Sequence, residues 1–302
     1  MQLLNFFKPA IIVLQNTFNE FSKDHVTSLG AGLSFYTILS LPPILMVILL
    51  LLGNFLGPTE LEDQINQNLT IIIGTDAAEI VHGIAKSAFT YQAGLSLTII
   101  GILTTYFSAT GVWVQLQWVL NYIWGVKPKA GTRNIVEKFL KDQLVALLIM
   151  VIIVVFMLIG LAYGMLLSYF KDFLELYLTD FSMYIMQLIN LLVSYGMAVL
   201  LFAFAFKYIP DVQLKWKHVF AGAVCTALLF GIGRYLIGLY LSRLIMITGV
   251  YGVAGSVVLL LLWIYYTSII LFWGAEFTKA LYLYRGNKVI PTRYATLTPH
   301  EF

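Results

Sequence analysis

The sequence predicts an all-α membrane protein whose chain crosses the bilayer six times. The 302-residue chain is 60% apolar and 11% charged, whereas soluble domains carry about 25% charged residues. Its apolar stretches are continuous and reach the ~20 residues that a transmembrane helix needs, and they lack the alternation of a transmembrane β-barrel. They lie at 30–56, 93–114, 144–167, 184–206, 219–241 and 252–277.

The chain divides into an N-terminal segment (1–28), a six-helix transmembrane domain (29–284) and a tail (285–302). The N-terminal segment has an apolar face at helical spacing, typical of an amphipathic helix on the cytoplasmic membrane surface or against the bundle. This face consists of Phe7, Ile11, Leu14, Phe18 and Phe21. The tail is polar, basic and contains Pro291 and Pro299, so we expect it to be mobile.

The acidic loop 58–92 predicts two short helices outside the membrane. Thr59 with Glu62 forms a capping box, and Asp76 with Glu79 resembles one. Each pair precedes a short stretch with apolar residues at helical spacing, which is the signal for the start of a helix.

The first two predicted spans contain unusual residues. Pro42 and Pro43 lie in the middle of the first span and should kink it, and hydroxyls such as that of Ser40 can satisfy the freed carbonyls. The second span is rich in hydroxyls, including Thr104 and Ser108, which either hydrogen-bond between helices or line a wet cavity. We expect its helix to continue to Trp124, before a stop at Gly125 and Pro128.

Positive charge gathers on one side of the predicted bundle. Of the 18 lysines and arginines, 14 fall in the N-terminal segment, the loops 127–141 and 207–217, and the tail from Lys279 onward. Because loops rich in lysine and arginine stay in the cytoplasm, both termini are expected there.

The fifth predicted span carries a single charged residue, Arg234. Four small residues share its helical face: Ala223, Ala227, Gly231 and Gly238. A lone charge within a membrane is costly, and small residues let another helix approach closely. We therefore expect Arg234 to point into the protein. The alternative is a side chain that extends to the nearer membrane interface.

Two amides of the fourth span, Gln187 and Asn190, lie at the depth of Arg234. We predict a polar cluster of Arg234, Asn190 and Gln187 in the outer half of the bundle. Glu276 lies roughly 36 Å below the outer end of the sixth span, too deep to pair with Arg234. It is interpreted either as a structural tether to a lysine or backbone amide, or as a cap on the basic inner surface or the N-terminal region.

Several stretches are similar to the YihY/BrkB family. They are residues 29–43 (LGAGLSFYTILSLPP), 121–126 (NYIWGV), 251–256 (YGVAGS), 263–266 (WIYY) and 274–276 (GAE). The resemblance covers the chain from about residue 20 to 285. It implies a six-helix protein of the bacterial inner membrane. It implies no settled activity, although the family once carried a ribonuclease BN label.

The residues argue against an enzyme. Metal-dependent hydrolysis needs clustered histidine and carboxylate ligands, yet His25, His82, His218 and His300 are scattered along the chain. The sequence has no grouping of serine, histidine and aspartate and no glycine loop for phosphate. We therefore expect no catalysis, no cofactor, no bound metal and no nucleic-acid partner.

The sequence favours a transporter or lipid-handling protein of the cell envelope. Its partners would be membrane lipids, including an anionic amphiphile whose head group meets the arginine. The alternative is a non-transporting scaffold that binds partner proteins and maintains the envelope. The residues expected around the polar cavity are Arg234, Asn190, Gln187, Ser40, Thr104 and Ser108.

Overall fold

The computed structural model describes residues 2–40, 111–129, 144, 155, 159, 181–248 and 252–298. Within them the chain is mostly helical, as predicted, and three helices are long and apolar enough to cross a membrane. The named elements are α1 (Gln2–Lys23), β1 (Val126–Pro128), α7 (Phe181–Tyr208), α8 (Trp216–Thr248), α9 (Gly252–Tyr284) and β2 (Ala295–Leu297). Residues 26–40 and 111–123 are also helical.

Several predictions lie outside the described residues. They include the remainder of the first two predicted spans, most of the third, the loop 58–92, and the side chain of Gln187. Six crossings therefore remain a prediction. Pro42, Pro43, Thr104 and Ser108 also lie outside this part of the chain.

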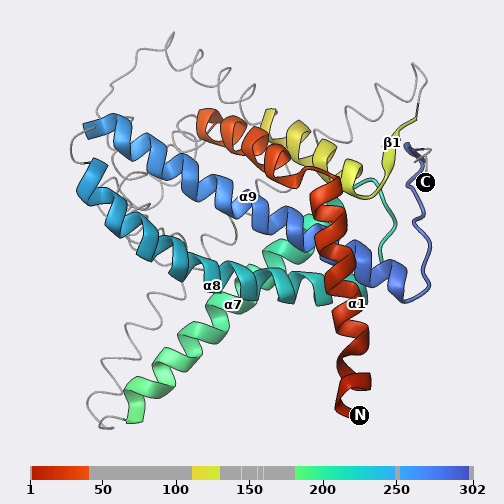
Figure 1. Cartoon of the computed structure of the whole chain (residues 1–302), viewed down its shortest axis with the longest axis horizontal. Coiled ribbons are helices and arrows are strands. Elements are labelled where there is room, and N and C mark those ends of the chain that lie inside the picture. The colour runs from red at the N-terminus through yellow and green to blue at the C-terminus, as the bar shows by residue number, and fades with distance from the viewer. Residues whose placement is uncertain are drawn as a thin grey trace.

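The helices α7, α8 and α9 extend beyond the predicted spans. The helix α8 contains 33 residues, and α9 has the same length. No proline interrupts 216–248 or 252–284, so nothing forces a break where the apolar stretch ends. In Figure 1, α8 and α9 run side by side, and α8 also contacts α7.

Two glycine–threonine pairs bring α8 and α9 close together. The Oγ1 of Thr226 on α8 donates to the carbonyl oxygen of Gly222 (2.8 Å), and that of Thr278 on α9 donates to the carbonyl oxygen of Gly274 (2.7 Å). A Cβ at Gly222 would overlap the Thr278 side chain, and one at Gly274 would overlap Thr226. Each glycine thus makes room for the threonine of the other helix, a packing typical of membrane helices.

The helix that ends at residue 123 stops where predicted. A turn covers 124 and 125, Gly125 has a φ of 63°, and β1 follows. Only glycine adopts this φ readily. The buried Asn121 then joins this helix to the α7–α8 connection: its Nδ2 donates to Asp211 Oδ2 (3.0 Å), and its Oδ1 accepts from the Asp211 amide (2.7 Å).

Within the described residues the tail contains a strand, whereas the sequence predicts a mobile segment. The strand β2 pairs antiparallel with β1, with Val126 opposite Leu297. The amide of Thr292 also donates to the carbonyl oxygen of Asp211 (2.9 Å). The residues that bond to the tail lie far from it in the sequence. They satisfy backbone N–H and C=O groups of the tail, and the sequence of the tail alone does not reveal these partners.

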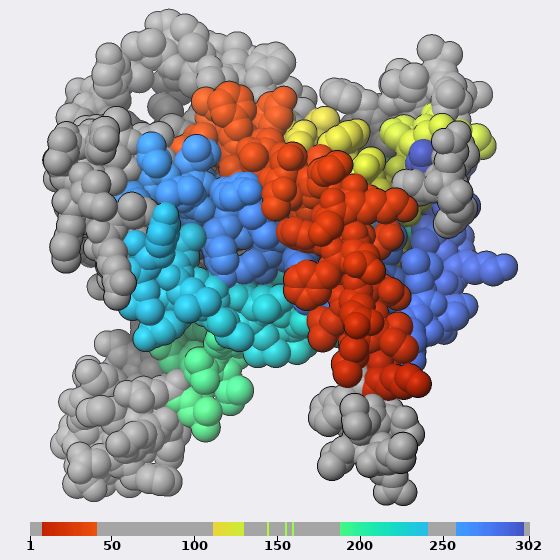
Figure 2. Space-filling view, in the orientation of Figure 1, coloured from red at the N-terminus to blue at the C-terminus, as the bar shows by residue number. Residues whose placement is uncertain are grey.

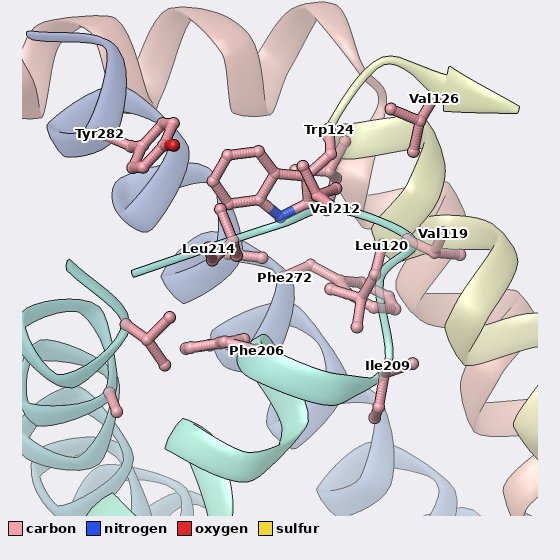
Figure 3. Packing of buried hydrophobic residues seen from close by; sticks show 14 of the residues in the cluster. Val119, Leu120, Trp124, Val126, Phe206, Ile209, Val212, Leu214, Phe272 and Tyr282 are labelled. Carbon is pink, nitrogen blue, oxygen red and sulfur yellow. The ribbon is translucent and has the colours of Figure 1, made fainter. Parts of the chain in front are cut away.

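The apolar core lies where α7 and α9 end and α8 begins; we call this the connector end. Figure 3 shows Trp124, Phe206, Leu214, Phe272 and Tyr282 meeting there. The rings of Trp124 and Tyr282 pack edge to face, with centroids 5.8 Å apart. The basic segments 127–129, 207–217 and 285–293 adjoin this core, so the structure gathers them at one end of the bundle.

The N-terminal helix packs against α9, and Figure 2 shows α1 lying across this face of the molecule. An amphipathic helix is confirmed, but only part of its apolar stripe packs: Phe21 lies against the apolar core, whereas three other members are largely exposed. Ile11, Leu14 and Phe18 are exposed, although the Phe18 ring contacts Trp273 at its edge. The buried side carries Val13, Thr17 and Asp24.

Candidate functional site

Three carboxylates converge between α1 and α9; we call Glu20, Asp24 and Glu276 the acidic cluster. One oxygen from each lies within 4.8 Å of one from each of the others. Among the described residues this is the one such group of three acid, histidine or cysteine side chains. Lys279 lies beside it, with Nζ 2.8 Å from Glu20 Oε2 and 3.8 Å from Glu276 Oε2.

The local folding explains the position of each group. Glu20 and Asp24 are four residues apart, which places them on one side of α1 as the helix ends at Lys23. A turn at 24 and 25, where His25 has a φ of 48°, redirects the chain into the helix 26–40. On α9, Glu276 and Lys279 are three residues apart and share a face.

The acidic cluster is shielded from solvent on the side of α9 and is partly exposed to solvent on the side of α1, at Glu20. The Glu276 side chain is 0% exposed and Asp24 is 6% exposed. The side chain of Lys279 is 13% exposed and that of Glu20 is 37% exposed. A buried charge is tolerated only with a charged or hydrogen-bonding partner, so Lys279 has a direct role in holding the carboxylates together.

Chemically, this arrangement suits ion binding and helix attachment. Carboxylate oxygens are the ligands that hard cations prefer. Among the acid, histidine and cysteine side chains of the described residues, the cluster consists of carboxylates alone. His218 lies elsewhere, with its ring against Tyr282.

The structure places Glu276 at the N-terminal region and 3.8 Å from Lys279, so two of the contacts suggested by the sequence, the N-terminal region and a lysine, occur together. Glu20, Asp24 and Lys279 were not predicted as site residues. A signal was present, since one pair of charges at helical spacing lies in the N-terminal segment and another lies at the end of the sixth predicted span. Their convergence depends on how α1 crosses α9, which neither pair reveals.

Arg234 is exposed in this structure, as are Tyr235 and Leu236 next to it. Ala223 and Ala227 on its helical face are buried, so that face is enclosed near the start of α8 and open at Arg234. The described side chains therefore do not enclose the guanidinium, in contrast to the orientation expected from the sequence.

The other predicted site residues are scattered. Asn190 is exposed and accepts a hydrogen bond from Ser194 Oγ (3.5 Å). Ser40 is buried, and its Oγ donates to the carbonyl oxygen of Thr37 (2.9 Å). Because the Gln187 side chain lies outside the described part, the cluster of Arg234, Asn190 and Gln187 stays a prediction.

With this geometry established, the chain can be compared with known proteins. A family model described as Virulence factor BrkB matches residues 17–292. The chain belongs to this family. The match confirms the YihY/BrkB resemblance, and the matched BrkB segment includes the whole acidic cluster and Lys279.

Curated relatives of this BrkB chain carry the name UPF0761 membrane protein. The one from Alteromonas mediterranea is 28% identical over 262 residues, which cover 86% of this chain and 84% of the relative. Those from Nitrosospira multiformis and Psychrobacter sp. are 27% and 22% identical, over 88% and 90% of this chain. The matches span 59% and 48% of those two longer proteins. No solved structure matches the chain.

Proposed function

We propose that this membrane protein handles an anionic amphiphile of the cell envelope, as a transporter or lipid-binding protein, and that Arg234 contacts the acidic head group. It crosses the bacterial inner membrane six times with both termini in the cytoplasm, and it performs no catalytic step. The observation that carries the proposal is an exposed arginine within an apolar helical window, Trp216–Tyr240.

The position of Arg234 along α8 supports this assignment. It lies 18 residues after Trp216, or about 27 Å along the helix axis. The connector end, with its basic segments, is the cytoplasmic side if the positive-inside rule holds, so Arg234 would lie in the outer half of the membrane. At about 27 Å along a hydrocarbon core ~30 Å thick, the guanidinium would lie close to the outer head groups, where it can form charge-assisted hydrogen bonds to carboxylate or phosphate.

Exposed apolar side chains surround Arg234 and would contact acyl chains. They include Ile232, Leu236 and Leu239 on α8. A ligand with an acidic head group and an apolar tail would satisfy both kinds of surface, whereas a free hydrophilic anion would leave the apolar side chains without a partner.

We expect the change Arg234→Ala to weaken binding of an acidic phospholipid by about tenfold, equivalent to ~1.4 kcal/mol. Arg234→Lys should retain part of the affinity because it keeps the charge but loses bidentate geometry. The measurement is native mass spectrometry of the purified protein with an acidic phospholipid added in steps, which counts the lipid molecules bound per chain.

The matched control is Arg285→Ala, which removes an exposed arginine beyond the end of α9. It should leave the amount of bound acidic phospholipid unchanged. Equal lipid binding by wild type and Arg234→Ala would contradict the proposal and would favour the scaffold alternative.

A further inference from the structure

The acidic cluster carries more negative charge than its lysine balances. When ionised, its three carboxylates and the Lys279 ammonium leave a net charge of −2 in a largely buried place. The neighbouring bases on α1 and its turn, Lys23 and His25, have exposed side chains. Excess charge of this kind is costly unless another cation compensates it.

Glu276 is the group with the greatest need for a further partner. Its side chain is 0% exposed, and neither of its carboxylate oxygens has a hydrogen-bond partner among the described residues. Its nearest cation, Lys279, lies at 3.8 Å, beyond hydrogen-bond distance. The carboxylate is directed at Glu20 and Asp24, with oxygens of all three within 4.8 Å of one another.

This spacing fits a single metal ion. Calcium binds oxygen ligands at about 2.3–2.6 Å, so two ligands of one ion lie up to ~5 Å apart. The charge of a divalent ion balances the cluster when all three carboxylates are ionised. The partly exposed Glu20 leaves an open side through which an ion could enter and keep water ligands.

We propose that Glu20, Asp24 and Glu276 bind one hard divalent cation, of the magnesium, manganese or calcium class, between α1 and α9. The ion connects the N-terminal helix to the last membrane helix. Lys279 competes with the ion for the same oxygens and therefore lowers its affinity. This site goes beyond the proposed function and does not depend on Arg234.

The test titrates Mn²⁺ alone into the purified full chain in detergent and counts bound ions by electron paramagnetic resonance. We expect one saturable site per chain, displaced by excess Mg²⁺ or Ca²⁺. The variants Glu276→Gln and Asp24→Asn should each bind at least tenfold more weakly. Manganese should also raise the unfolding temperature of the wild type, because it binds the folded state.

Lys279→Gln should change the affinity for Mn²⁺ in the opposite direction. It removes the competing ammonium and should therefore tighten Mn²⁺ binding severalfold. The matched control is Lys23→Gln, which makes the same charge change on an exposed side chain and should shift affinity less than twofold. Absence of saturable binding by the wild type would overturn the proposal even if a variant fails to fold. Unchanged affinity in both Glu276→Gln and Asp24→Asn would also overturn it.

Discussion

Replacing Lys279 by alanine is expected to destabilise the protein by about 3 kcal/mol in the presence of a chelator, the lower end of the range for breaking a buried ion pair. The change leaves the fully enclosed Glu276 without its neighbouring cation and removes the ion pair to Glu20. The lower end applies because Glu20 is partly open to solvent, which weakens its interaction. Thermal or denaturant unfolding in detergent measures the loss.

The control is Lys23→Ala, an exposed lysine at the end of α1. Exposed charges contribute little, so its effect should remain within about 0.5 kcal/mol. Equal stabilities of Lys279→Ala and Lys23→Ala would show that the acidic cluster does not need the lysine.

The second large effect is expected for Gly274→Ala on α9, which should destabilise the fold by about 2–3 kcal/mol. The new methyl group would overlap Thr226 of α8. Thr226 cannot turn away at no cost, because its χ1 is restricted and its hydroxyl is hydrogen-bonded to Gly222. Adding Thr226→Gly to this variant should restore part of the stability, since it removes the overlapping side chain.

Gly238→Ala supplies the matched control on α8. Within the described part of the chain, a Cβ at Gly238 meets no heavy atom within 4 Å. Alanine favours a helix over glycine by about 0.5–1 kcal/mol, so this variant should be slightly more stable than the wild type. If Gly274→Ala were equally stable, the close approach of α8 and α9 would be wrong.

Hydropathy and helix signals predicted much of the described fold. The last three apolar stretches form long helices because twenty or more apolar residues must satisfy their own backbone in lipid. Gly125 marked a helix end because the required positive φ is a local property. The strand in the tail was missed because β2 gains its hydrogen bonds from β1, which precedes it by more than 160 residues.

The candidate site was harder to predict because its residues also come from parts of the chain that lie far apart in the sequence. Glu276 was identified as an unusual charge from its place at the end of an apolar stretch. Its partners Glu20 and Asp24 lie at the end of α1 and in the turn that follows, on the polar side of the predicted amphipathic helix, which the pattern did not mark as a packing face. The structure packs that side through the ion pair with Lys279, while Ile11, Leu14 and Phe18 of the apolar stripe are exposed.

The most direct test of the central claim, that a charged cluster holds α1 on α9, is a charge exchange across the contact. Lys279→Glu places a fourth carboxylate in the cluster and should strongly lower the unfolding midpoint measured in detergent with chelator. Adding Glu20→Lys restores both the net charge and an ion pair at the same place. The account predicts that the double variant recovers most of the wild-type midpoint. A double variant no more stable than Lys279→Glu alone would contradict it.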